Sequence, residues 1–182
     1  MNIRMIVSVA AVIVLMTGCS QKIRVESDWD VEADFTRYKM WDWVPGDAGV
    51  TESLTIDNAE VRERIEKVVE EGFWAKGYER TSGAADFYVK YYVGYGEELN
   101  TRNIENYYEY MNYSVFVPRV TRTYTDVWEQ GTIIIDIIDA DAKKLVWRGN
   151  AWTEVNPQAG PRENEPKLKE AVKKILEDFP PK

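Results

Sequence analysis

The chain has 182 residues, of which 45% are hydrophobic and 30% are charged, as is typical of a soluble globular domain. Its 31 acidic and 23 basic side chains give a formal charge of −8. This balance argues against nucleic-acid binding and against a polybasic membrane patch, because both need clustered Lys and Arg. The sequence has no His and one Cys, which excludes histidine-based triads and zinc sites, internal disulfides and cysteine-based metal clusters. No cofactor or metal is expected.

The N-terminus has the pattern of an export signal. Arg4 supplies a positive charge, and the mostly apolar segment Met5–Met16 is shorter than the roughly 20 residues that a membrane span needs. Thr17 and Gly18 then precede Cys19, an arrangement that resembles the bacterial lipobox, in which the Cys is lipidated and becomes the new N-terminus. The usual Leu three residues before the Cys is replaced by Met in this chain.

We therefore expect a lipoprotein signal peptide at 1–18 and acyl chains such as palmitate on Cys19. The alternative is an ordinary secretory peptide with an incidental Cys. Ser20 follows the Cys, where an Asp would indicate retention in the inner membrane, so the resemblance implies an outer-membrane anchor facing the periplasm. In a cell without an outer membrane, the anchor would be the cell membrane. Residues 19–22 form a very short tether, and the domain at 23–182 is expected to stay close to its membrane.

Two strands are predicted next. Every second residue from 23 to 29 is Ile, Val, Ser or Trp, and charged residues alternate with them, as in a half-buried strand. Phe35–Val44 reads as a second strand that Pro45 ends. Trp41 and Trp43 share one face of this strand. They would form either a sugar-stacking pair or part of a packed sheet face, and the packed face is favoured because aromatic residues at strand spacing are usually core.

The strongest helix signal covers 57–76. Asp57 can cap the helix and Glu60 can complete a capping-box pair, while Gly77 supplies a left-handed stop. The apolar residues recur at helical spacing and form one stripe: Val61, Ile65, Val68, Val69 and Phe73.

Strand alternation returns at Ala85–Tyr95, and a compositionally distinct segment follows at 96–120. This segment is rich in Tyr, which offers large, stiff and amphipathic contact area, so one interpretation is a recognition surface. The other is a long hairpin or loop whose tyrosines pack over the sheet edge. The candidate binding residues are Tyr107, Tyr108, Tyr110 and Tyr113.

Gly131–Gly149 is the clearest fold signal. Two β-branched apolar runs flank the polar segment Asp139–Lys143, which predicts a hairpin at the centre of the sheet. Asp136 lies among isoleucines, and Arg148 lies on the returning strand. A buried carboxylate with a raised pKa would be the enzymatic interpretation, and a cross-strand ion pair is the favoured one.

A second amphipathic helix is predicted at Pro166–Phe179, with Pro166 in its first turn and Pro180 preventing its continuation. Strands combined with two one-faced helices predict an α+β, two-layer domain, in which both helices cover one face of a largely antiparallel sheet.

Several segments together resemble a bacterial lipoprotein family, domain of unknown function 4136. Besides the lipobox-like start, they are the Asp34–Lys39 run with Trp41 and Trp43, Lys76–Tyr78, Ala85–Phe87, Gly131–Asp139, Leu145–Gly149 and Ile175–Pro181. The resemblance implies a periplasm-facing lipoprotein with one α+β domain. It implies no catalytic residues, because the family is named for its lack of an assigned activity.

These observations favour a non-enzymatic, membrane-anchored envelope lipoprotein that binds another envelope component through its sheet edge or its tyrosine-rich segment. The alternative is a glycan- or peptidoglycan-binding module that uses exposed Trp and Tyr. An enzyme working through carboxylates is disfavoured, since Asp136, Asp139 and Asp141 lie along one hairpin rather than across a cleft.

Overall fold

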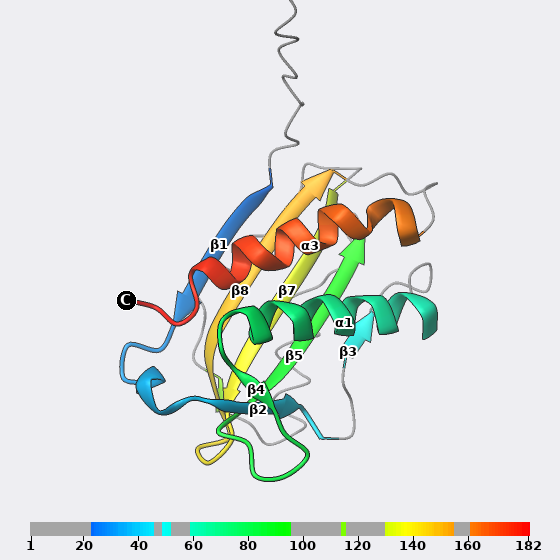
Figure 1. Ribbon diagram of the computed structural model, residues 1–182. Helices are drawn as coiled ribbons and strands as arrows, with labels where there is room; N and C mark the ends of the chain where they lie inside the picture. Colours follow the sequence, from blue (N-terminus) through cyan, green and yellow to red (C-terminus); the bar gives the residue numbers. More distant parts are fainter. Residues whose placement is uncertain (1–22, 46–48, 52–58, 96–113, 116–129, 155–160) are drawn as a thin grey trace, which may run out of the picture.

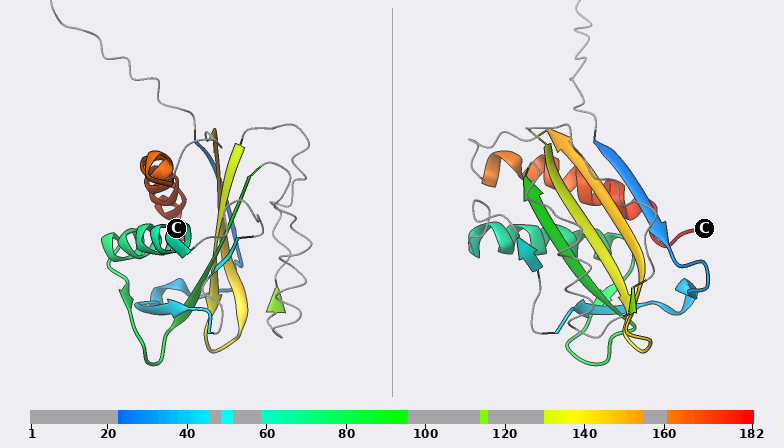
Figure 2. Two further views of the ribbon diagram at one scale, coloured as in Figure 1. Left: turned by 90° about the vertical axis from the view of Figure 1, so that its right-hand side faces the viewer. Right: turned by 180° about the vertical axis from the view of Figure 1, so that it is seen from behind.

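A computed structural model describes residues 23–45, 49–51, 59–95, 114–115, 130–154 and 161–182. In chain order the elements are β1 (Arg24–Trp29), the 3₁₀ turn η1 (Phe35–Arg37), β2 (Met40–Trp43), β3 (Gly49–Thr51), α1 (Ala59–Ala75), β4 (Glu79–Arg80), β5 (Phe87–Tyr95), β6 (Ser114–Val115), β7 (Gln130–Asp139), β8 (Lys144–Glu154) and α3 (Pro161–Glu177). The strands form one sheet, and α1 and α3 lie side by side on one of its faces (Figure 1, Figure 2). The predicted two-layer α+β architecture is confirmed.

The sheet is mixed, and its main strand order is β1-β8-β7-β5-β2-β4. The long strands β1, β8, β7 and β5 pair antiparallel. The short strands pair parallel. Strands β2 and β3 both pair with β5, along the edge that does not contact β7, while β4 pairs with β2 and β6 pairs with β8. The antiparallel expectation therefore holds for the four long strands and not for the short ones.

The β7–β8 hairpin lies at the centre of the sheet, as predicted. The Asp139 carboxylate accepts hydrogen bonds from the Asp141 and Ala142 amides at 3.0 and 2.8 Å, which fixes the turn. The register shifts between Ile137 and Ile138, so Val146 is an extra residue in β8. Because of this bulge, two consecutive residues, Val146 and Trp147, both join the core under the helices.

Helix α1 buries the predicted stripe: Ile65, Val68, Val69 and Phe73 are buried, and Val61 is half-buried. Gly77 has φ = 86°, which confirms the left-handed stop. The predicted capping residue Asp57 lies outside the described residues. Helix α3 begins at Pro161, five residues before the predicted start, so Pro166 is inside the helix. Pro161 suits a first helical position, and the exposed Pro166 forgoes the hydrogen bond to the Arg162 carbonyl.

The predicted strand at Phe35–Val44 is wrong in its first half. The Asp34 side chain accepts hydrogen bonds from the Thr36 amide at 3.0 Å and from the Thr36 hydroxyl at 2.6 Å. This local capping favours the tight turn η1, and the strand begins only at Met40.

The face away from the helices carries a buried row of charges. Lys90 pairs in register with Asp136, Asp136 with Arg148, and Arg148 with Asp28. Their signs alternate across β5, β7, β8 and β1. Lys90 and Asp136 are fully buried and Arg148 is 4% exposed. Asp136 and Arg148 form the predicted cross-strand ion pair, with two hydrogen bonds of 2.6 Å.

Candidate binding pocket beside helix α1

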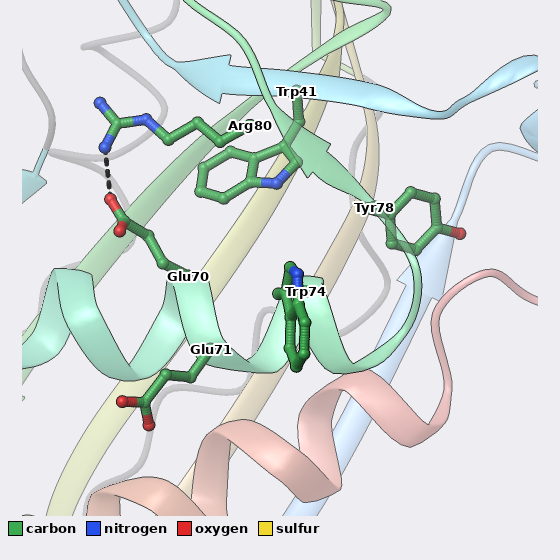
Figure 3. Close-up of a pocket in the computed structure, with 6 residues that line it drawn as sticks. All are labelled: Trp41, Glu70, Glu71, Trp74, Tyr78 and Arg80. Atoms are coloured by element: carbon green, nitrogen blue, oxygen red, sulfur yellow. Dashed lines mark hydrogen bonds and ion pairs between the residues drawn. The ribbon is translucent and has the colours of Figure 1, made fainter.

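A pocket of about 290 Å³ lies between the last turns of α1 and the strands β2 and β4. Figure 3 shows Arg80 and Glu70 meeting beside Trp41, with Trp74 on the helix next to them and Glu71 directed toward α3. Trp74 is 77% exposed, whereas Trp41 and Tyr78 are 1% and 8% exposed. The pocket thus has a buried aromatic floor and one indole ring that faces solvent. Its lining residues are Trp41, Glu70, Glu71, Trp74, Tyr78 and Arg80.

The end of α1 positions one side of the pocket. The Tyr78 amide donates to the Phe73 carbonyl at 3.1 Å, and the Gly77 amide donates to the Trp74 carbonyl at 2.9 Å. With Gly77 in the left-handed region, this is a Schellman motif. It turns the chain directly into β4, and the Glu79 amide then bonds to the Lys39 carbonyl at 3.0 Å. Trp74 and Arg80 are thereby held close to Trp41 on β2.

Arg80 forms the charged wall. Its guanidinium lies 6.0 Å from the centre of the Trp41 ring and 5.9 Å from that of Trp43, within cation–π range. It also donates to Glu70 and, at 3.2 Å, to Asp42. Figure 3 shows the Glu70–Arg80 pair at the edge of the pocket. These contacts hold a flexible side chain in one place.

The other glutamate, Glu71, lies 3.4 Å from Lys169 of α3, which also approaches Glu165 at 3.4 Å. One turn earlier on α1, burial and then the negative charge of Glu70 raise the pKa of Glu66 above its ordinary value. Burial is the larger cause of this pKa shift, so the shift reflects the partly desolvated middle of α1 rather than the pocket itself.

The sequence-predicted binding residues fall into two groups. Trp41 and Trp43 are buried and pack edge-to-face at 5.1 Å, so the packed-face interpretation of this pair is confirmed. Cys19, Tyr107, Tyr108, Tyr110 and Tyr113 lie outside the described residues, and their roles remain predictions.

The acidic residues of the hairpin have structural partners. Asp139 accepts hydrogen bonds from Arg37 and, at 2.7 Å, from the Tyr38 hydroxyl. Burial acts to raise the pKa of Asp139, but the bonds from Ala142, Tyr38 and Arg37 outweigh it and hold the pKa below its ordinary value. Burial and the Asp139 carboxylate in turn raise the pKa of Tyr38. These contacts connect η1 to the hairpin turn. Asp136 forms an ion pair with Arg148.

Sequence reasoning missed Trp74, Arg80 and the two glutamates as a site. The available signal was a Trp beside the last residue of the apolar stripe, on the polar side of an amphipathic helix. Within the described ranges, no helix is long and apolar enough to cross a membrane, and no group of three or more potential metal-ligating side chains is found.

A family model matches most of the chain. The model of DUF4136, domain of unknown function, matches residues 25–181. The chain belongs to this family. The DUF4136 match contains every element described above except the first residue of β1, so the pocket is part of the family domain. No curated protein matches the sequence.

Solved structures show the same fold at low sequence identity. A DUF4136 family protein from Bacteroides thetaiotaomicron is 18% identical, with a TM-score of 0.58 over 87% of this chain and 96% of that one. A PDZ domain protein from Parabacteroides distasonis is 12% identical, with a TM-score of 0.53 over 89% of this chain. The alignment covers 37% of that longer protein. These likenesses concern the fold alone.

Proposed function

We propose that this DUF4136 protein is a lipid-anchored, periplasm-facing lipoprotein of the bacterial envelope, and that it binds another envelope component without catalysing a reaction. The observation that carries the binding role is the exposed Trp74 ring above the buried floor of Trp41 and Tyr78. A large exposed aromatic ring beside a pocket is typical of recognition surfaces, where it supplies contact area at little cost in conformational entropy.

The position of the pocket supports this role. Strand β1 begins at Arg24, five positions after Cys19, and its first residue is in register with Trp152, Thr132 and Gly94 across the sheet. Trp41 in the pocket is in register with Phe87. Gly94 and Phe87 are seven positions apart on β5, which corresponds to about 23 Å along the strand. An anchor at Cys19 would leave β2 and β4, which contribute to the pocket, near the end of the sheet opposite the start of β1 (Figure 1).

The charges support binding rather than catalysis. Asp136 is paired with Arg148, Asp139 accepts hydrogen bonds at both oxygens, and Glu70 is paired with Arg80. A general acid or base needs a carboxylate that is free to exchange a proton with a substrate. These carboxylates instead stabilise the fold or the wall of the pocket.

The anchor is tested by feeding cells an alkyne-labelled palmitate and fractionating the tagged full-length protein. We expect label on the wild type and membrane recovery, and loss of both in Cys19→Ser. Equal labelling of the two would refute anchoring at this residue.

The binding role is tested separately by photocrosslinking in cells. A photoreactive amino acid replaces Glu71 at the pocket rim or, as control, Val31, which is 87% exposed on the loop after β1. We expect discrete adducts at position 71 that are absent at position 31. The same pattern at both positions, or no adduct at either, would refute a binding role for the pocket.

A further inference from the structure

The charges around the Trp74 pocket are balanced locally. Glu70 is paired with Arg80, whose guanidinium also contacts Asp42, and Glu71 lies close to Lys169. An anionic ligand would meet the carboxylates of Glu70 and Glu71, which both line the pocket. A cationic ligand would find the space above the Trp41 and Trp43 rings already taken by Arg80. Both kinds of charge are therefore disfavoured.

The same side chains suit a neutral ligand that has one apolar face and a polar edge. The Trp74 ring offers a flat apolar surface, and the paired carboxylates keep lone pairs that can accept further hydrogen bonds. Arg80 has five N–H donors, of which the bonds to Glu70 and Asp42 use only some. A pyranose ring matches this arrangement, because its C–H groups form an apolar face while its hydroxyls donate and accept at the rim.

We propose that the Trp74 pocket binds a neutral saccharide, with one hexopyranose ring stacked on Trp74 and its hydroxyls on Glu70, Glu71 and Arg80. This inference rests on the proposed binding function and names its ligand class. The volume of about 290 Å³ lies at the lower end of the range for small-molecule sites. The pocket is thus large enough for one ring rather than for a long stretch of chain, so the ligand is a terminal or branching sugar of a glycan.

The test uses the full-length protein in detergent micelles and isothermal titration with N-acetylglucosamine trimer, maltotriose and choline chloride. We expect at least one of the two sugars to bind and choline not to bind. Trp74→Ala should weaken sugar binding by about tenfold or more, and Trp74→Phe should retain part of it, since a smaller ring keeps a stacking surface. Trp29→Ala is the matched control, because Trp29 is 38% exposed on β1, at the opposite edge of the sheet from β4.

Failure to bind either sugar at millimolar concentration, or equal affinity in the wild type and Trp74→Ala, would overturn the saccharide proposal. Binding of choline alone would also overturn it in favour of a cation site. If the sugars do not bind but position 71 forms a discrete protein adduct in cells, the binding function stands and only the ligand class is wrong. If both experiments are negative, both proposals fall.

Discussion

The two faces of the central sheet are both buried but differ in chemistry. The face under α1 and α3 is apolar and strongly aromatic, with Trp41, Phe87 and Trp147 packed around Phe73 and Phe179 at ring-centre distances of 5.0 to 6.1 Å. The opposite face holds Lys90, Asp136 and Arg148 among buried isoleucines. One face is therefore specified by shape complementarity, and the other by the pairing of opposite charges.

This difference predicts how the stability of the domain responds to mutations on each face. Apolar packing loses stability gradually as atoms are removed or added. A buried charge row fails sharply, because removing one member leaves its partner charged and desolvated. The four predictions below test this contrast, beginning with the change expected to cost most.

Asp136→Asn should destabilise the domain by about 3–5 kcal/mol, because it leaves the Arg148 guanidinium buried without its carboxylate. Urea unfolding monitored by circular dichroism measures this loss. The triple variant Lys90→Met, Asp136→Leu and Arg148→Met should recover most of the stability, since it removes the three buried charges together. A single-variant cost below about 1 kcal/mol would show that the charge row does not specify this face.

Gly149→Ala tests the helix-covered face. A Cβ at this position would lie 2.3 Å from the Trp147 ring and 2.5 Å from the Ile175 side chain, both in the core. We expect a loss of about 1–3 kcal/mol from overpacking, measured as a lower thermal midpoint. The control is Gly83→Ala, where the Cβ would lie at an ordinary 3.5 Å from the Thr81 hydroxyl. Equal midpoints for the two variants would contradict close packing at Gly149.

Asp139→Asn tests the polar cluster at the hairpin end and should cost about 2 kcal/mol at pH 7, because the charged acceptor of the Arg37 and Tyr38 bonds is lost. The folded pKa of Asp139 is below the ordinary 3.8, so its contribution is complete above the unfolded pKa and is lost as the pH falls through the folded pKa. The difference in the free energy of unfolding between wild type and Asp139→Asn should therefore become smaller below about pH 4.

Thermal unfolding of the wild type and of Asp139→Asn at pH 7 and pH 3 measures this difference in stability. Asp141→Asn serves as the control on the same turn, since its side chain is 88% exposed and lies 3.5 Å from Arg37. A gap that is independent of pH would show that the Asp139 charge does not contribute.

Trp74→Ala should have the smallest effect on folding, within about 0.5 kcal/mol, because the side chain is 77% exposed. A thermal midpoint close to that of the wild type would show that Trp74 does not support the core, as expected for a binding residue. A large loss of stability would instead indicate a structural role and would weaken the proposed function.

Some elements could be predicted because their information is local. The spacing of Val61, Ile65 and Phe73 defines one helical face, and Gly77 ends that helix through its own backbone freedom. The isoleucine run with its Asp turn likewise specifies a hairpin from neighbouring residues. The errors were also local in origin. The Asp34 side chain caps a tight turn and so delays the start of β2, and Pro161 begins α3 five residues before Pro166.

The candidate site could not be predicted in this way. Its lining comes from β2, the end of α1 and β4, and Arg80 meets Trp41 only because two short parallel strands pair. The Asp136–Arg148 pair within the hairpin could be predicted, but the extension of the charge row to Lys90 on β5 and Asp28 on β1 joins strands that are distant in sequence. The resemblance to DUF4136 correctly indicated the family, but a family without an assigned activity identifies no site.

From its residue pattern alone, this protein could be assigned its charge, its helices, its central hairpin, its fold class and the exclusion of histidine chemistry. Strand order, the parallel edge, the burial of both sheet faces and the convergence at Trp74 were decided by tertiary structure. The physical reason is that periodicity reports which side chains share a face of one element. It does not report which element will cover that face. Nor does it report which strands will pair, because the backbone N–H and C=O groups at a strand edge can hydrogen-bond to any other strand.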